Sequence, residues 1–229
     1  MNGKVKLKLA AWEIGCVFWI CIAGSLLHFA FELTEFWTPM ALFAAVNESA
    51  WEHSKMYFWP GVVYALAQYT YTRHQANNYW LGKAVALGLT PLMIFICYFS
   101  YISWSLGAGI KPSLPVMLGI MVTGISVGQL ASYMILTAKP FAPVTFRYAT
   151  AMFATLLLMF SAFTFLPPKV FLFEHFACYK YTGEFGILAD YEPYRVFAKV
   201  DENGQTIAGG GANYCKTSNA EMFADTALN

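Results

Sequence analysis

Charged residues are scarce in this sequence, because Asp, Glu, Lys and Arg make up only 12% of its 229 residues. Soluble domains average roughly 25%, so the chain has too few charges to cover a water-facing surface. Hydrophobic residues make up 58% of the chain and occur in long uninterrupted runs, a pattern typical of membrane-spanning helices. The net charge is +1 and there is no basic stripe, so no nucleic-acid partner is expected.

Apolar segments long enough to cross a bilayer occur five times along the chain. A hydrocarbon core of about 30 Å needs roughly 20 helical residues, and the segments cover residues 12–36, 56–72, 81–106, 112–138 and 148–166. The first is longer than the apolar region of a signal peptide, so we expect it to be retained. The second is the shortest and the weakest. The sequence therefore predicts an all-α integral membrane protein, with a bundle of about five helices over residues 1–168 and a short tail over residues 169–229.

Basic residues are distributed unevenly between the two expected sides of the membrane. One side holds Lys4, Lys6, Lys8, Arg73, Lys83, Lys139 and Arg147, whereas the short loops of the other hold Lys55 and Lys111. The positive-inside bias then predicts a cytoplasmic N-terminus in the plasma (inner) membrane, and five spans put the tail outside.

The tail carries features that leave its role open. Cys178 and Cys215 can pair on an oxidising outer side or stay free thiols. Its aromatic residues Tyr191, Tyr194, Phe197 and Tyr214 favour docking on other subunits of a membrane complex. Glu174, His175 and Cys178 form a weaker ligand set, for which solvated tail residues are the expected interpretation.

Acidic residues are absent between positions 53 and 173. Those before this gap are Glu13, Glu32, Glu35, Glu48 and Glu52. Glu13 lies near the start of the first segment, where an acid needs no special explanation. The other four gather at the expected outer side, together with His28 and His53. Ionisable groups at membrane depth are costly and usually face a partner, a cavity or an ion.

Helical spacing predicts how these polar residues are arranged. His28, Glu32 and Glu35 are spaced i, i+4 and i+7, so they are expected to share one face of the first helix. Glu48 and Glu52 are again four apart, if residues 47–55 are helical with Asn47 as the N-cap.

Two imidazoles and several carboxylates are suitable ligands for a divalent transition metal ion. The candidate ligands are His28, Glu32, Glu48, Glu52 and His53. The same groups can instead act as acid and base, relay protons, or form a structural clamp in which Lys55 pairs with Glu52 or Glu48. No HExxH, HxxxH or CxxC motif is present, so the pattern leaves the reaction open. Convergence of the His28 and His53 side chains to about 5 Å would favour a ligand site.

The segment Val46-Asn47-Glu48-Ser49-Ala50-Trp51-Glu52-His53-Ser54-Lys55 resembles a motif of a family of small, functionally uncharacterised polytopic membrane proteins of bacteria and archaea. The resemblance extends to Gly24, Ser25, His28 and Phe29, and to the pieces 163–168, 182–183 and 186–187. It implies a polytopic membrane protein, and it implies no particular activity. The chain departs from the pattern at Ala45, where a proline is more usual, and in the tail beyond about Asp190.

Overall fold

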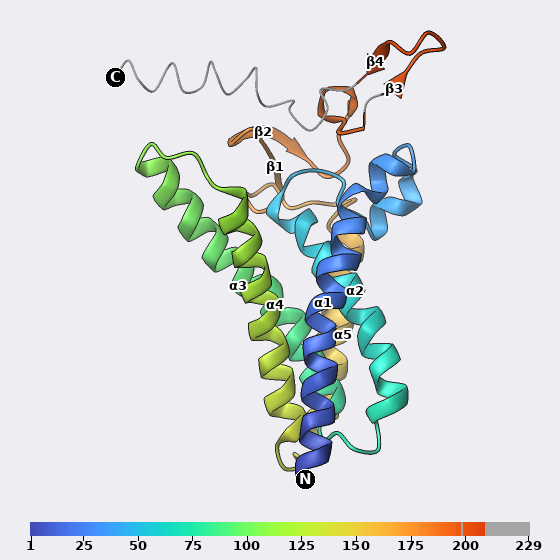
Figure 1. Ribbon diagram of the computed structural model, residues 1–229, viewed down its shortest axis with the longest axis vertical. Coiled ribbons are helices and arrows are strands. Elements are labelled where there is room, and N and C mark those ends of the chain that lie inside the picture. The colour runs from blue at the N-terminus through green and yellow to red at the C-terminus, as the bar shows by residue number, and fades with distance from the viewer. Residues whose placement is uncertain (198, 209–229) are drawn as a thin grey trace.

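The computed structural model describes residues 1–197 and 199–208. Over this part, the chain forms a bundle of α-helices with short antiparallel strands at one end (Figure 1). The helices are α1 (Gly3–Leu33), α2 (Ala50–Thr72), α3 (Tyr79–Gly107), α4 (Leu114–Thr137) and α5 (Thr145–Ala162). Each covers most of one of the five expected apolar segments, so the predicted helical architecture is confirmed.

Four of these helices, α1, α3, α4 and α5, are long and apolar enough to cross a membrane. Their outward faces expose large apolar side chains, including Phe18, Leu26, Leu130 and Leu158. Such faces suit lipid and not water, since a water-facing helix would present polar residues there. Helix α2 is not in this set. It is long enough, but it carries Glu52, Lys55, Gln68 and other polar residues.

Helices α3 and α4 form an antiparallel pair in which small residues allow close approach. A Cβ atom added to Gly128 would lie 2.1 Å from Thr90 Oγ1, and one added to Gly82 would lie 2.2 Å from Leu136 Cδ1. Gly128 of α4 and Gly82 of α3 therefore serve packing within the bundle. Helix α1 packs against α2 and α4, and α5 packs against α3.

The two helix ends that flank the connection between α1 and α2 both differ from those expected from the sequence. Helix α1 ends at Leu33, and Glu35 and Phe36 adopt φ values of 53° and 57°. Glu35 therefore lies off the helical face of His28, contrary to the i+7 expectation. Helix α2 is capped by Ser49, whose side chain accepts a hydrogen bond from Glu52 N, and not by Asn47. The short 3-10 helix η1 (Thr38–Leu42) lies between them.

The chain after α5 returns to the end of the bundle opposite the N-terminus (Figure 1). Strands β1 (Glu174–Ala177) and β2 (Lys180–Phe185) form one antiparallel hairpin. After the 3-10 helix η2 (Glu192–Tyr194), strands β3 (Lys199–Val200) and β4 (Thr206–Ala208) form a second.

Candidate metal centre

His28, Glu48 and His53 converge at the strand end of the bundle. One ligand atom from each lies within 4.8 Å of the others. The rings of His28 and His53 have centroids 5.1 Å apart, and His53 Nε2 lies 3.4 Å from Glu48 Oε2. Helix α1 supplies His28, the loop before α2 supplies Glu48, and the first turn of α2 supplies His53. The convergence that distinguishes a ligand site from scattered polar residues is therefore present.

The orientation of the His53 ring is fixed by the backbone. His53 Nδ1 lies 2.9 Å from the carbonyl oxygen of Ser49, and a carbonyl only accepts, so the hydrogen-bond network assigns a proton to Nδ1. The neutral ring then directs the lone pair of Nε2 at the Glu48 carboxylate. Two acceptors at this separation require a positive species between them, either a proton on Nε2 or a metal ion. Metal-bound histidines usually donate their other ring N–H to an oxygen in this way.

Glu48 carries its charge in this setting. Burial by itself raises the pKa of Glu48, but the charge and hydrogen bond of His53 and the charges of His28 and His175 outweigh it and lower the pKa to about 2. The carboxylate is thus ionised at neutral pH, as a metal ligand must be. Glu48 precedes the helix, so it does not share a helical face with Glu52. The expectation of an i, i+4 pair is wrong, because the helix begins at Ala50, two residues later than a cap at Asn47 would place it.

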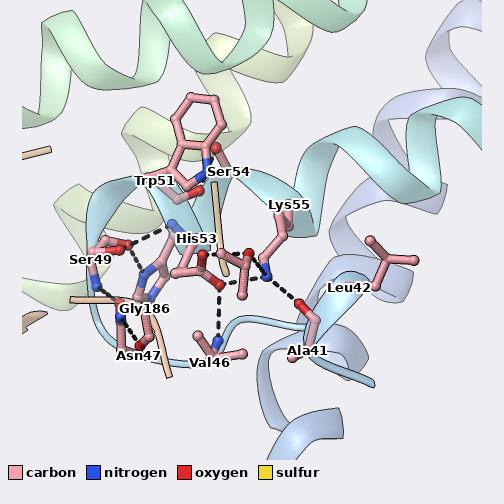
Figure 2. A network of polar contacts seen from close by, with 12 residues as sticks. Ala41, Leu42, Val46, Asn47, Ser49, Trp51, His53, Ser54, Lys55 and Gly186 are labelled. Carbon is pink, nitrogen blue, oxygen red and sulfur yellow. Dashed lines mark hydrogen bonds and ion pairs between the residues drawn. The ribbon is translucent and has the colours of Figure 1, made fainter. Parts of the chain in front are cut away.

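Glu52 is buried and pairs with the buried Lys55, whose side chain and its contact with Ala41 are seen in Figure 2. Its carboxylate pairs with Lys55 and accepts hydrogen bonds from Val46 N and from the Thr164 hydroxyl. Lys55 Nζ also donates to Ala41 O and to Thr164 Oγ1 at 2.6 Å and 2.8 Å. All three ammonium hydrogens and both carboxylate oxygens are therefore used. This network is the structural clamp considered above, and it leaves Glu52 outside the cluster of His28, Glu48 and His53.

Glu32 is also directed away from the cluster. Its two carboxylate oxygens accept hydrogen bonds from the backbone amides of Val196 and Phe197, at 3.0 Å and 2.7 Å. Glu35 beside it pairs with Arg195 and Lys199. Hydrogen bonds from Lys199 and then Arg195 lower the pKa of Glu35. We call residues 190–197 the strap, since these contacts fasten it across the C-terminal end of α1.

The segments that carry the family resemblance contact one another. Asn47 Nδ2 donates to Gly186 O at 2.7 Å, and Thr164 joins the network of Glu52 and Lys55. Gly186 has a φ of 66°, and a Cβ there would lie 2.6 Å from Thr164 O. A glycine is required at this position, because the left-handed backbone and the close contact both disfavour a side chain.

His175 was expected to be solvated, and the structure corrects this. It is 1% exposed, because β1 alternates and directs His175 and Ala177 inward. Its Nδ1 accepts a hydrogen bond from Glu48 N at 3.0 Å. His175 thus positions the backbone of a candidate ligand. The alternation of β1 was the available signal, but four residues are too few to predict a strand.

A pocket opens beside the cluster, between the C-terminal end of α1 and the strap. Its walls include His28, Glu48 and His175, with aromatic residues of α1 and of the strap. Its empty volume is about 510 Å³, which includes space open to solvent. Two of the three converging ligands are therefore accessible from one cavity.

A second polar group that the sequence analysis passed over lies in the opposite half of the bundle. Glu13 on α1 accepts hydrogen bonds from Lys83 Nζ of α3 at 2.6 Å and from Gln68 Nε2 of α2 at 2.8 Å. All three side chains are buried. Glu13 and Lys83 were treated as helix-end residues. They form an internal ion pair, which a linear sequence does not reveal because the partners lie 70 positions apart.

The tail aromatics contact this chain. Tyr191 stacks on Phe36, the Tyr194 ring contacts His175, and the Phe197 ring contacts Phe29. Tyr214 and Cys215 lie outside the described residues. Cys16, Cys21 and Cys97 are free thiols, whereas Cys178 has a partner. Both the docking of a partner subunit and the pairing of Cys178 with Cys215 stay predictions.

Comparison with known proteins places the chain in a family without assigning an activity. No curated protein and no solved structure matches it. A match to the family of unknown function DUF6512 covers residues 1–187. That range contains the bundle, the three converging ligands, and the loop and strand that hold them. The chain belongs to this family of unknown function, DUF6512.

Proposed function

We propose that the chain is an integral membrane protein that holds a divalent transition metal ion on His28, Glu48 and His53. The observation that carries this is the pair of facing acceptors, His53 Nε2 and Glu48 Oε2, 3.4 Å apart, with His28 beside them. A cation at this point would satisfy both atoms. Two imidazoles and one carboxylate leave a fourth position open, the arrangement typical of zinc sites that act on a substrate. Zinc is thus the first ion to test.

The proposed membrane topology places this centre at the outer side. Helix α2 is taken as the fifth span, since it runs beside α1 and its polar residues face the interior. The positive-inside bias puts the N-terminus in the cytoplasm of a plasma-membrane protein. The strands then lie outside, because Figure 1 shows them at the end of the bundle opposite the N-terminus. Reaction of single cysteines introduced at Lys6 and Gln205 with an impermeant reagent tests this orientation.

Metal analysis of the full chain, purified in mild detergent without chelators, tests the metal proposal. We expect about one zinc ion per chain, and its loss in His53→Ala. His74→Ala is the matched control, because His74 is exposed and lies at the other end of α2. Wild-type protein without metal, and unable to take up added zinc, would overturn the proposal. The Glu48–His53 pair would then be an acid–base pair that shares a proton.

Association with other membrane protein subunits is the alternative role. Recovery of the chain with other proteins after gentle purification would support it, and recovery only as a monomer would count against it.

A further inference from the structure

His175 presents a hydrogen-bond donor that the protein does not use. Its Nδ1 accepts from Glu48 N, so the network assigns the ring proton to Nε2 when the ring is neutral. Nε2 is buried and has no hydrogen-bond partner among the residues that the structure describes. Such donors are rare in folded proteins, because they lose their hydration without compensation.

His175, which carries the unused donor, is one of the residues that line the pocket, together with His28 and Glu48. A metal ion on the proposed site would place a positive charge with an open coordination position at the same cavity. A metal ion and an N–H donor both attract oxygen atoms that carry negative charge. The remaining wall is largely aromatic and aliphatic, with residues such as Phe29, Leu188 and Tyr191. Glu32 and Asn47 also line it, and the Glu32 carboxylate is held by the backbone amides of Val196 and Phe197. The pocket thus combines an anion-attracting end with an apolar body.

We propose that this pocket binds an oxyanion, a carboxylate or a phosphate group, attached to a small apolar moiety. One oxygen takes the open metal position, and a second accepts the Nε2–H of His175. This inference rests on the proposed metal centre. Because Glu48 repels anions, oxyanion binding requires the metal: the protein without metal binds the same probes far more weakly. His175 is here a binding residue, and no reaction step is assigned to it.

Cobalt(II) in place of zinc makes the test direct, since its visible absorption changes when a ligand enters the coordination shell. The cobalt-loaded full chain is titrated with acetate, butyrate and inorganic phosphate. We expect a saturable spectral change, with butyrate tighter than acetate if the apolar wall takes part. The stronger class among carboxylate and phosphate identifies the group for which the pocket is built.

Two substitutions at His175 separate its donor from its positioning role. The amide oxygen of His175→Asn keeps an acceptor near the Nδ1 position but leaves no group at Nε2. The amide of His175→Gln supplies an N–H near the Nε2 position. We expect His175→Asn to keep its cobalt and to weaken oxyanion binding about tenfold or more, with partial recovery in His175→Gln. His74→Asn serves as the matched control.

Each outcome has a distinct meaning. A wild-type chain that takes up no cobalt overturns the metal centre itself. A cobalt-loaded chain that responds to none of the probes overturns the oxyanion inference alone. An unchanged affinity in His175→Asn, with cobalt retained, likewise overturns the role of Nε2. Cobalt stoichiometry and thermal unfolding of each variant identify any that fails to fold, and His175→Gln then carries the comparison.

Discussion

Glu13 and Lys83 form an ion pair inside the bundle, with Lys83 Nζ 2.6 Å from Glu13 Oε1 and both side chains buried. Gln68 supplies a further hydrogen bond to the same oxygen. The pair joins α1 to α3 in the half of the bundle farther from the candidate metal centre. A buried charge is tolerated only while its partner is present, and this makes the pair a sensitive point of the fold.

Removing one partner of this pair leaves an uncompensated charge. We expect Lys83→Met to lower the free energy of unfolding by about 3–5 kcal/mol. The double variant Glu13→Gln, Lys83→Met removes both charges and should be less destabilised than Lys83→Met alone. Denaturation followed by circular dichroism in detergent measures both. Equal losses in the single and double variants would contradict a direct pairing.

Thr164 is the neutral member of the network of Glu52 and Lys55. Thr164→Val removes one hydrogen bond from each charged group, so we expect a loss of about 1–3 kcal/mol in the free energy of unfolding. Thr150→Val is the matched control, since the Thr150 hydroxyl is exposed and bonds only to its own helix at Phe146 O. A similar effect for both variants would argue that the network adds no stability.

Gly186 combines a positive φ with close contact to Thr164 O. Gly186→Ala should destabilise the protein by more than about 1 kcal/mol, because strain and crowding add. Gly183→Ala isolates the strain: Gly183 has a φ of 81° but nothing within 4 Å of an added Cβ. Thermal unfolding of the two variants compares them, and a larger loss for Gly183→Ala would contradict the crowding argument.

Glu32 and Glu48 both belong to the ligand set drawn from the sequence, but only Glu48 joins the cluster. We therefore expect Glu48→Gln to lose most bound zinc, and Glu32→Gln to retain it. Glu32→Gln should instead loosen the strap, since its carboxylate accepts two backbone hydrogen bonds there. Metal content and zinc titration of both variants provide the measurement. Zinc loss in Glu32→Gln comparable to that in Glu48→Gln would refute this division.

Acid should weaken the attachment of the strap at Glu35. The folded protein lowers the pKa of Glu35 from 4.5 through Lys199 and Arg195. Its contribution is therefore complete above that unfolded value and is lost as the pH falls through the lower folded value. Hydrogen exchange at Val196 and Phe197, corrected for intrinsic rates, should accelerate in this window. Glu35→Gln should exchange faster at neutral pH, with a smaller additional change in acid.

The bundle could be predicted from the sequence to a greater extent than the site. Composition and run length predicted the helices, because a chain with so few charges can hide its backbone and apolar surface only as lipid-facing helices. Helix ends were less predictable. Ser49 displaced Asn47 as the cap of α2, because the Asn47 amide reaches Gly186 O and its side-chain oxygen accepts from Ser49 N.

By itself, the sequence determined the helical bundle and the concentration of His and Glu at one end of it. Both follow from local composition and spacing, which do not depend on distant parts of the chain. The tertiary structure decided which acids serve which purpose. Glu52 pairs with Lys55 and Thr164, and Glu32 accepts hydrogen bonds from the strap amides. Of these three acids, Glu48 is therefore the one that lies beside the two histidines. Lys55 lies only three positions from Glu52, but Thr164 and the strap amides lie more than 100 positions from the acids they contact, and spacing along a helix does not encode such contacts.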